Sequence, residues 1–394
     1  MAPPRRPDKR ASKGAASGSG SLKNEPTEKA RPEKSERSGR SGGFRPLAGG
    51  LRAKKHATDA TPQTRNRPEK PDGLAKPPPS RRELVKGPMP IMRAPLMLDM
   101  PDFRDYALID SGFEQKLERY GPYTIVRPEG QALWQPRLPE AAWAAADAIF
   151  AGDEDEDASG RWRFQNRLEG AKQEDAWQLG FETIRFNARF TAFRHMGFFP
   201  EQAAHWDWFS DLIRRAGRPV NILNLFGYTG VASLIAAKAG ATVTHIDASK
   251  KAIGWARENQ SLSGLDGAPI RWIAEDAVKF VEREARRGTS YDGIIMDPPH
   301  YGRGPGGEVW QYFKDIGNLL HGARAILSEC PLFFILSSYA IRASFMASHE
   351  LARDAFSGLG GTVESGELLI REEDGERRIS TSLFTRWSAG GSDD

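Results

Sequence analysis

The chain has 394 residues and one cysteine, Cys330, so no internal disulfide can form and we expect a reducing, cytoplasmic location. No apolar run reaches the roughly 18 to 20 residues that span a bilayer, and no signal peptide follows "MAPPRRPDKR", which argues against membrane and secreted classes. The formal charge of +4 is unevenly distributed, because residues 1–90 hold 22 Lys/Arg against 9 Asp/Glu and the rest hold 34 against 43.

Residues 1–90 are rich in Arg, Lys, Ser, Gly and Pro and nearly free of large apolar side chains. Such a segment cannot bury enough surface to offset its ordering entropy, and we predict a disordered basic tail. The tail is either a polycation that binds RNA phosphates or a solvated leader with no partner. A transit peptide is disfavoured by the interspersed Asp and Glu.

Short apolar pieces separated by turn residues follow, and they predict a small β-rich domain over residues 100–195. In "WQPR", "RWRF" and "RFNARF" aromatic residues alternate with arginine, a mixture that stacks bases and holds phosphates. The alternative is an ordinary half-exposed sheet. We therefore treat contact with the substrate as one of two interpretations of this domain.

From residue 196 to 390 the pattern alternates between strands and helices, which predicts a doubly wound α/β domain with a parallel sheet. The expected helices cover 230–239, 250–263, 277–286, 309–327 and 343–357. The expected strands cover 220–225, 242–247, 270–274, 292–297 and 332–338, followed by 363–371 and 378–387. The Asp374-Gly375 turn between the last two predicts an antiparallel hairpin.

Ligands of such sheets lie beyond the carboxyl ends of the strands, so the residues there are the candidate site. The first strand ends in "NLFGYTG", where glycines permit close approach of the backbone, although a full G-x-G-x-x-G is absent. Asp247 follows Gly227 by 20 residues and can accept hydrogen bonds from ribose hydroxyls. Asp276 can bind an adenine amino group with Ala277, or it can simply cap the next helix.

The fourth strand ends in "DPPHY", residues 297–301. Two prolines fix φ and remove two N–H donors, which leaves a rigid turn with the Asp297 carboxylate and a carbonyl as acceptors. These acceptors can hold the two hydrogens of an exocyclic amine so that the nitrogen lone pair faces a methyl donor. His300 or Tyr301 can stack on the base.

The segments "FFPEQAAHWDW", "ILNLFGYTG", "HIDASKKAIGWARENQ" and "IIMDPPHYGRGPGGEVW" together resemble class I S-adenosylmethionine-dependent methyltransferases of the large-subunit rRNA methyltransferase I group. The resemblance covers about 100–387. It implies a seven-stranded Rossmann-like sheet whose last strand is antiparallel, S-adenosylmethionine as cofactor, and ribosomal RNA or a ribosomal particle as partner.

The resemblance also implies roles for individual residues. Asp297, Pro298, Pro299, His300 and Tyr301 would border the reacting centre. The cofactor would contact Asn224, Phe226, Gly227, Tyr228, Thr229, Gly230, Asp247, Ala248, Asp276 and Ala277. No metal site is predicted.

Relatives that methylate cytosine C5 need a cysteine after the fourth or fifth strand, where this chain has "DPPHY" and "LSSY". Cys330 precedes the fifth strand, and we expect it to be a buried apolar residue. The sequence therefore favours methyl transfer to a nitrogen of a base in ribosomal RNA. The alternatives are a protein or small-molecule N-methyltransferase, a Rossmann oxidoreductase, or a non-catalytic RNA-binding protein.

The glycine-rich segment after "DPPHY" keeps two interpretations. Arg303 can pair with an RNA phosphate while Glu308 orients the amine or Arg303 itself. Alternatively the segment is a mobile loop, and Glu308 lies at a helix start, where its charge favours the helix dipole.

Overall fold

The computed structural model describes residues 85–152, 160–339, 341 and 343–390. Most of the predicted basic tail therefore lies outside the described residues, and its disorder stays a prediction. The last residues of the predicted tail, 85–90, are described, and they contact the folded part of the chain. The Val85 amide donates to the Ser357 hydroxyl at 3.1 Å, and the Pro88 carbonyl accepts from Gly358 and Gly360, each at 3.0 Å.

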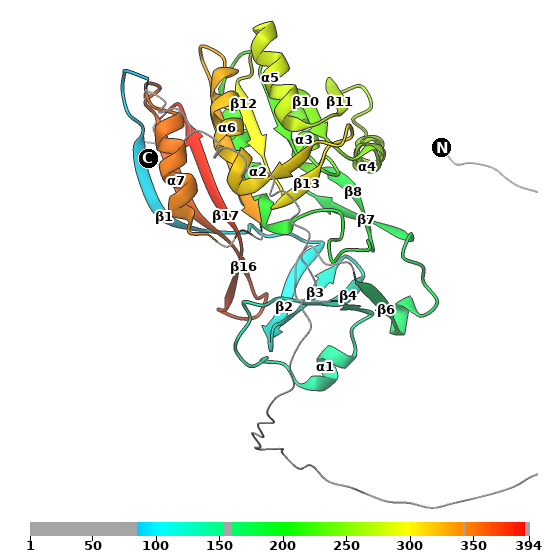
Figure 1. Ribbon diagram of the computed structural model, residues 1–394. Helices are drawn as coiled ribbons and strands as arrows, with labels where there is room; N and C mark the ends of the chain where they lie inside the picture. The colour runs from blue at the N-terminus through cyan, green and yellow to red at the C-terminus, as the bar shows by residue number, and fades with distance from the viewer. Residues whose placement is uncertain (1–84, 153–159, 340, 342, 391–394) are drawn as a thin grey trace, which may run out of the picture. The chain divides into compact units, whose positions relative to one another are not determined.

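A large, mostly parallel sheet dominates the described chain (Figure 1). Its strands lie in the order β1-β16-β17-β15-β12-β9-β10-β11, and only β17 runs against its neighbours. The seven strands expected from the resemblance are all present, and β1, which the sequence did not predict, pairs in parallel with β16 as an eighth. Their bounds are β1 Ile91–Asp99, β9 Asn221–Leu225, β10 Thr242–Asp247, β11 Ile270–Ala274, β12 Gly293–Met296, β15 Phe333–Tyr339, β16 Thr362–Arg371 and β17 Arg378–Ser388.

Seven α-helices accompany the described strands. They are α1 Glu140–Ala144, α2 Ala203–Arg215, α3 Val231–Lys238, α4 Lys250–Leu262, α5 Ala277–Arg287, α6 Tyr312–Ala325 and α7 Phe345–Ala355. Side chains of a strand alternate between the two faces of the sheet. On one face Ile222 and Ile295 join a cluster with α2 and α3, and on the other Leu223 and Ile294 join a cluster with α5, α6 and α7. The sheet is therefore covered on both sides, as a parallel sheet requires.

The β-rich part holds a five-stranded sheet in the order β2-β3-β4-β5-β6 and a separate β7–β8 hairpin. Apolar side chains of this part, including Phe103, Tyr120 and Phe186, belong to the same buried cluster as the α2 and α3 face of the large sheet. The boundary at 195/196 accordingly stays a proposal. The bounds are β2 Tyr106–Gly112, β3 Gln115–Tyr120, β4 Tyr123–Pro128, β5 Ala148–Ala151, β6 Arg161–Phe164, β7 Ala176–Phe181 and β8 Ile184–Arg189.

A buried ion pair ties β3 to β4. The Arg127 guanidinium donates Nε and Nη2 hydrogens to the two Glu118 oxygens, each at 2.7 Å, and Glu118 also accepts from the Tyr106 hydroxyl at 2.8 Å. Burial alone would raise the pKa of Glu118, but the Arg127 charge and these hydrogen bonds hold it below its usual value. Both partners are satisfied, so removing either one would leave an uncompensated buried charge.

The predicted elements of the α/β part are confirmed within a few residues, and the antiparallel β16–β17 hairpin is present. One difference follows from pairing that the sequence pattern did not reveal. The helix predicted from 309 begins at Tyr312, because Val309–Gln311 form β14 and pair with β13, Tyr301–Arg303. The glycine-rich segment is thus a small hairpin.

Candidate active site

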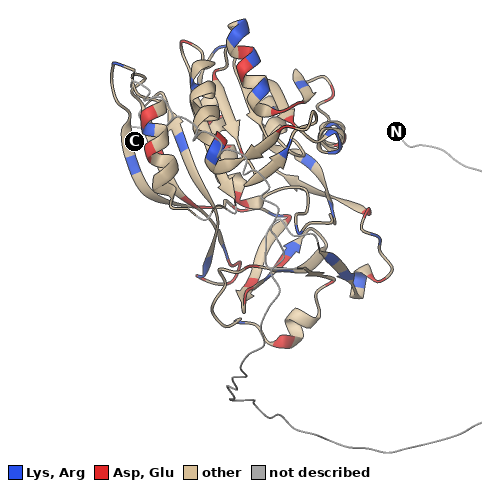
Figure 2. Cartoon of the chain, in the orientation of Figure 1, with Lys and Arg blue, Asp and Glu red and all other residues tan. Residues whose placement is uncertain are grey.

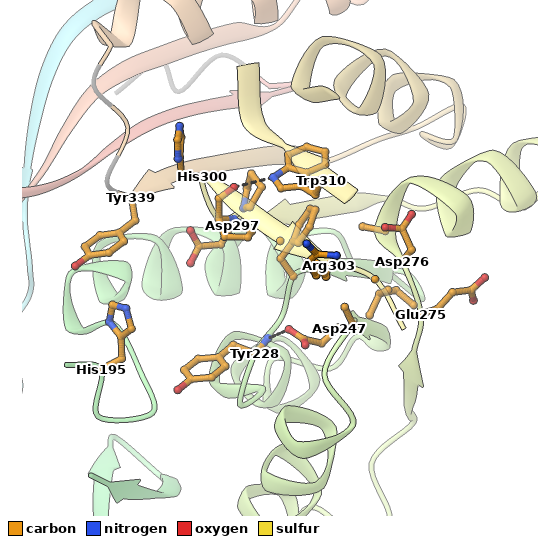
Figure 3. Close-up of a pocket in the computed structure, with 18 of the residues that line it drawn as sticks. His195, Tyr228, Asp247, Glu275, Asp276, Asp297, His300, Arg303, Trp310 and Tyr339 are labelled. Atoms are coloured by element: carbon orange, nitrogen blue, oxygen red, sulfur yellow. Dashed lines mark hydrogen bonds between the residues drawn. The ribbon is translucent and has the colours of Figure 1, made fainter. Parts of the chain in front are cut away.

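A cavity of about 350 Å³ opens at the carboxyl ends of β9, β10, β12 and β15 (Figure 3). A smaller cavity adjoins it and shares Phe199, Phe226, Tyr228 and Asp297. The size is within the range of sites that hold a cofactor-sized molecule. Parallel strands bring their carboxyl ends to one edge, which is why residues far apart in the sequence meet here.

The turn after β9 approaches the cavity with an unusual backbone. Phe226 and Tyr228 both have positive φ, +57° and +51°, and both line the cavity. Positive φ costs a non-glycine residue on the order of 1–3 kcal/mol, and such strained residues cluster at functional sites as well as in turns. Gly227 between them is required by packing, because a Cβ there would lie 2.3 Å from the His245 ring.

Asp247 ends β10 and holds the same turn. Its Oδ2 accepts from the Tyr228 amide at 2.9 Å and its Oδ1 accepts from the Ser249 amide at 2.7 Å. Burial raises the pKa of Asp247, and these two hydrogen bonds oppose that rise. A carboxylate oxygen has two lone pairs, so each oxygen retains an acceptor position.

Asp276 caps helix α5, as the alternative interpretation expected, because its Oδ1 accepts from the Lys279 amide at 3.0 Å. It nevertheless lines the cavity together with Ala277, and Oδ2 remains as an acceptor. The cap therefore does not exclude a contact with a ligand. The neighbouring Glu275 also lines the cavity, while its carboxylate pairs with Arg283.

Asp297 follows β12 and lies where the two cavities meet. Its Oδ2 accepts from the Gln202 side-chain amide at 3.3 Å, and the Gln202 carbonyl oxygen accepts from the Ser337 hydroxyl at 2.8 Å. Burial, and secondarily the Glu201 carboxyl, raise the pKa of Asp297 to about 7. This carboxyl can thus gain or lose a proton near neutral pH.

The proline turn after Asp297 is held by its neighbours. The Pro299 carbonyl accepts from the Trp310 indole at 2.7 Å, and the His300 carbonyl accepts from the Tyr312 amide at 3.0 Å. Among the described residues no donor is bonded to the Pro298 carbonyl. That carbonyl and the Asp297 carboxylate are therefore the two acceptors that the turn can offer.

The β13–β14 hairpin determines where Arg303 and Glu308, for which the sequence left two interpretations, lie. Arg303 lines the cavity, and its guanidinium lies 6.0 Å from the centre of the Tyr301 ring. Glu308 instead pairs with Lys279 and accepts from the Gly306 amide at 2.8 Å. It neither starts a helix nor bonds Arg303, so these two interpretations are wrong, while a contact of Glu308 with the amine stays a prediction.

Most of the residues predicted from the sequence do meet at this site. Two of these residues line neither cavity. Gly230, with φ of +83°, is the N-cap of helix α3, and Tyr301 is 43% exposed on β13. The larger cavity is lined by Phe226, Tyr228, Asp247, Ala248, Asp276, Ala277, Asp297, Pro298, Pro299 and His300. The smaller one is lined by Asn224, Phe226, Gly227, Tyr228, Thr229 and Asp297.

The sequence did not single out Gln202 or the aromatic residues that line the cavity before β9 and after β15. Gln202 lies inside "FFPEQ", which carried the resemblance but received no role. His195, Phe199 and Tyr339 also line the larger cavity. The signal that could have found Tyr339 is its place at the carboxyl end of a predicted strand, directly after the serines.

Cys330 is exposed, which corrects the expectation that it is buried. It precedes β15, so it lies at the amino ends of the parallel strands and does not line the cavity. The two serines of "LSSY", which end the fifth predicted strand near the place where relatives can have a cysteine, form hydrogen bonds with other side chains. Ser337 bonds Gln202, and Ser338 bonds the Tyr312 hydroxyl at 2.7 Å.

Comparisons with known proteins found a matching family and several similar chains. Residues 140–359 match the family described as S-adenosylmethionine-dependent methyltransferase. A ribosomal RNA large subunit methyltransferase K/L from Shewanella frigidimarina is 39% identical over 110 residues, which are 27% of this chain and 15% of the relative. A ribosomal RNA large subunit methyltransferase I from Shewanella denitrificans is 37% identical over 82 residues, 21% of each chain. The chain thus spans about a fifth or less of these relatives.

Among solved structures, a SAM-dependent methyltransferase from Agrobacterium tumefaciens is 53% identical, with a TM-score of 0.74 over 78% of this chain and 98% of that one. A putative SAM-dependent methyltransferase from Streptococcus mutans has a TM-score of 0.54 over 72% of this chain and 75% of that one, at 18% identity. The second likeness concerns the fold alone.

Proposed function

Because the chain belongs to the S-adenosylmethionine-dependent methyltransferase family, it is a methyltransferase that uses this cofactor, and we propose that it methylates a ring or exocyclic nitrogen of a base in ribosomal RNA. The family excludes the oxidoreductase alternative, and a methylation assay distinguishes the enzyme from a non-catalytic protein that retains the fold. The observation that carries the proposal is that the Asp297-Pro298-Pro299 turn lines the same cavity as Asp247.

The residues present fit the cofactor. Asp247 retains acceptor positions for ribose hydroxyls at the end of β10, and Asp276 and Ala277 line the same cavity for the adenine. Phe226 and Ile246 supply apolar walls. When bound, S-adenosylmethionine supplies a methyl group on a positively charged sulfur and leaves as the neutral S-adenosylhomocysteine.

The chain's own contribution at the acceptor is orientation and proton transfer. The Asp297 carboxylate and the Pro298 carbonyl accept hydrogens of the nitrogen, which directs its lone pair to the methyl carbon. As the new N–C bond forms, the nitrogen becomes acidic, and Asp297 takes the released proton. A pKa near 7 suits a general base at neutral pH, and the Gln202 amide holds the carboxylate in place.

The β-rich part supports RNA as the substrate through its charges rather than its aromatic rings. In β6, Arg161 and Arg163 are exposed, and the blue segments there are visible in Figure 2. The intervening Trp162 packs on Phe150 and Phe190. The arginines are thus available for phosphates, while the rings belong to the core. The names of the relatives point to the same substrate.

Mass spectrometry of ribosomal RNA nucleosides tests the proposal. RNA from cells that lack the gene should miss one methylated base, and the wild-type copy should restore it while Asp297→Ala should not. Asp354→Ala, an exposed carboxylate on α7, is the matched control and should restore the base. If the deletion changes no nucleoside, ribosomal RNA is not the substrate, and the protein or small-molecule acceptors become the next candidates.

A further inference from the structure

Three aromatic rings form one wall of the cavity. The His195 ring lies 4.9 Å from Phe199 and 5.5 Å from Tyr339, and Phe199 lies 5.4 Å from Tyr339, measured between ring centres. All three residues line the larger cavity. We call them the aromatic wall. Neither the sequence nor the proposed chemistry gave them a role.

The aromatic wall and the cofactor residues lie on different sides of Asp297. Figure 3 shows Tyr339 and His195 on one side of Asp297, and Asp247 and Asp276 on the other. A molecule against the aromatic wall would therefore reach Asp297 from the side opposite to the adenosine part of the cofactor. Such a position is what an acceptor needs if its nitrogen is to meet the methyl group in line.

The β-rich part holds the aromatic wall in place. Arg194, next to His195, donates to the Pro128 carbonyl at 3.3 Å and to the Tyr339 hydroxyl at 3.4 Å. The Arg194 carbonyl in turn accepts from Arg127 at 2.8 Å, and Arg127 is fixed by the buried ion pair with Glu118. The wall is a preorganised surface, because its rings are positioned before any ligand binds.

His195 adds a polar edge to this apolar surface. Burial, with the nearby charges of Arg127 and Arg194, lowers the pKa of His195 to about 3, so the ring is neutral. A neutral imidazole has one donor and one acceptor nitrogen. Neither nitrogen is hydrogen-bonded to another described residue, so both are available to the edge of a heteroaromatic ring.

We propose that the aromatic wall of His195, Phe199 and Tyr339 is the subsite that stacks the acceptor nucleobase and presents its nitrogen to Asp297. The inference rests on the proposed function. The sequence offered His300 or Tyr301 as the stacking residue; Tyr301 lies outside both cavities, and His300 lines the larger one without belonging to the aromatic wall. Unpaired bases of RNA bind by stacking on aromatic side chains, and loss of one such contact weakens binding about 10- to 100-fold.

Transfer of a tritiated methyl group to ribosomal RNA from cells that lack the gene tests the subsite. Tyr339→Leu and Phe199→Leu should each lower kcat/KM for RNA about 10- to 100-fold. For Tyr339→Leu, which lines only the larger cavity, calorimetry with S-adenosylhomocysteine should give a Kd within about twofold of wild type, which shows that the fold and the cofactor side are intact. Tyr339→Phe keeps the ring and should remain within about threefold of wild type.

Phe113→Leu is the control, because Phe113 is 65% exposed on the β2–β3 turn and lines neither cavity; its kcat/KM should match wild type. Wild-type kcat/KM in both leucine variants would overturn the subsite and leave the methyltransferase intact. A Tyr339→Phe variant as slow as Tyr339→Leu would also overturn it, because the hydroxyl and its bond to Arg194, rather than stacking, would then matter. If wild-type enzyme itself transfers no methyl group to this RNA, the proposed function fails first.

Discussion

Asp297 changes charge in the pH range in which the enzyme would be assayed, because burial raises its pKa to about 7. In the proposed mechanism only the carboxylate takes the proton of the acceptor, so kcat/KM for the proposed RNA substrate should rise with pH and level off above about pH 7. At saturating cofactor, the sulfonium charge should favour the carboxylate and move the rise in kcat to lower pH.

Asp297→Asn keeps the shape and one acceptor oxygen but cannot titrate. We expect this variant to be about 100-fold slower or more, with a kcat/KM that no longer depends on pH between about pH 6 and pH 8. Initial rates of methyl transfer across that range measure both effects. An acid limb that persists unchanged in the asparagine variant would assign the titration to another group.

At the scale of single residues, the sequence predicted the site residues that lie at the carboxyl ends of strands. Asp247 ends one apolar strand and Asp297 follows another, and parallel pairing brings the carboxyl ends of strands together at one edge of the sheet. Gln202 and His195 could not be predicted in this way. They reach the cavity from segments outside the sheet, and their contacts with Asp297 and Tyr339 depend on tertiary packing.

At the scale of elements, β6 places its arginine side chains and its aromatic rings on opposite faces. Its alternation leaves Arg161 and Arg163 exposed while Trp162 packs inward. Replacing both arginines by glutamine should weaken binding to ribosomal RNA and lower the slope of log K against log salt by roughly 0.7 to 0.9 per arginine that contacts a phosphate. Binding of S-adenosylhomocysteine should not change.

Filter binding of labelled RNA at several salt concentrations measures this slope. Arg214 and Arg215 on α2 are also exposed, and their double glutamine variant is the matched control. Equal slopes for wild type and the β6 variant would mean that RNA does not approach this strand.

Sequence patterns predict the start of one helix correctly and the start of another wrongly. Helix α5 begins where its cap, Asp276, predicted it, because a cap is a local signal. Helix α6 begins three residues after the predicted position, because Val309 and Gln311 pair across the hairpin with Arg303 and Tyr301. Propensity alone does not reveal such pairing. The strand β1 was missed because Pro95 interrupts its strand pattern; among the described strands it pairs along one edge only, with β16.

At the scale of the whole molecule, buried histidines couple folding to pH. Burial lowers the pKa values of His195, His205 and His245 to about 3. Between pH 3 and the ordinary value of 6.5, the unfolded chain therefore binds more protons at these positions than the folded chain. Their contribution to stability is fully present above pH 6.5 and is lost as the pH falls.

His205 allows this contribution to be isolated, because neither ring nitrogen has a hydrogen-bond partner among the described residues. His205→Leu should raise the free energy of unfolding by about 1 kcal/mol at pH 7.5, since it removes two unsatisfied buried groups. The gain should grow by about 2 kcal/mol at pH 5, where the unfolded histidine is protonated. Urea unfolding at the two pH values measures it, and an equal gain at both would show that His205 is not coupled to protons.

The direction of β17 has a practical consequence for labelling. Because β17 runs against β15, its last residue, Ser388, pairs with Phe333 at the start of β15, whereas Tyr339 at the other end of β15 borders the cavity. A fluorophore attached just beyond Ser388 would stand one strand length away from the chemistry. It would report whether the sheet is assembled without blocking the cavity to the proposed RNA substrate.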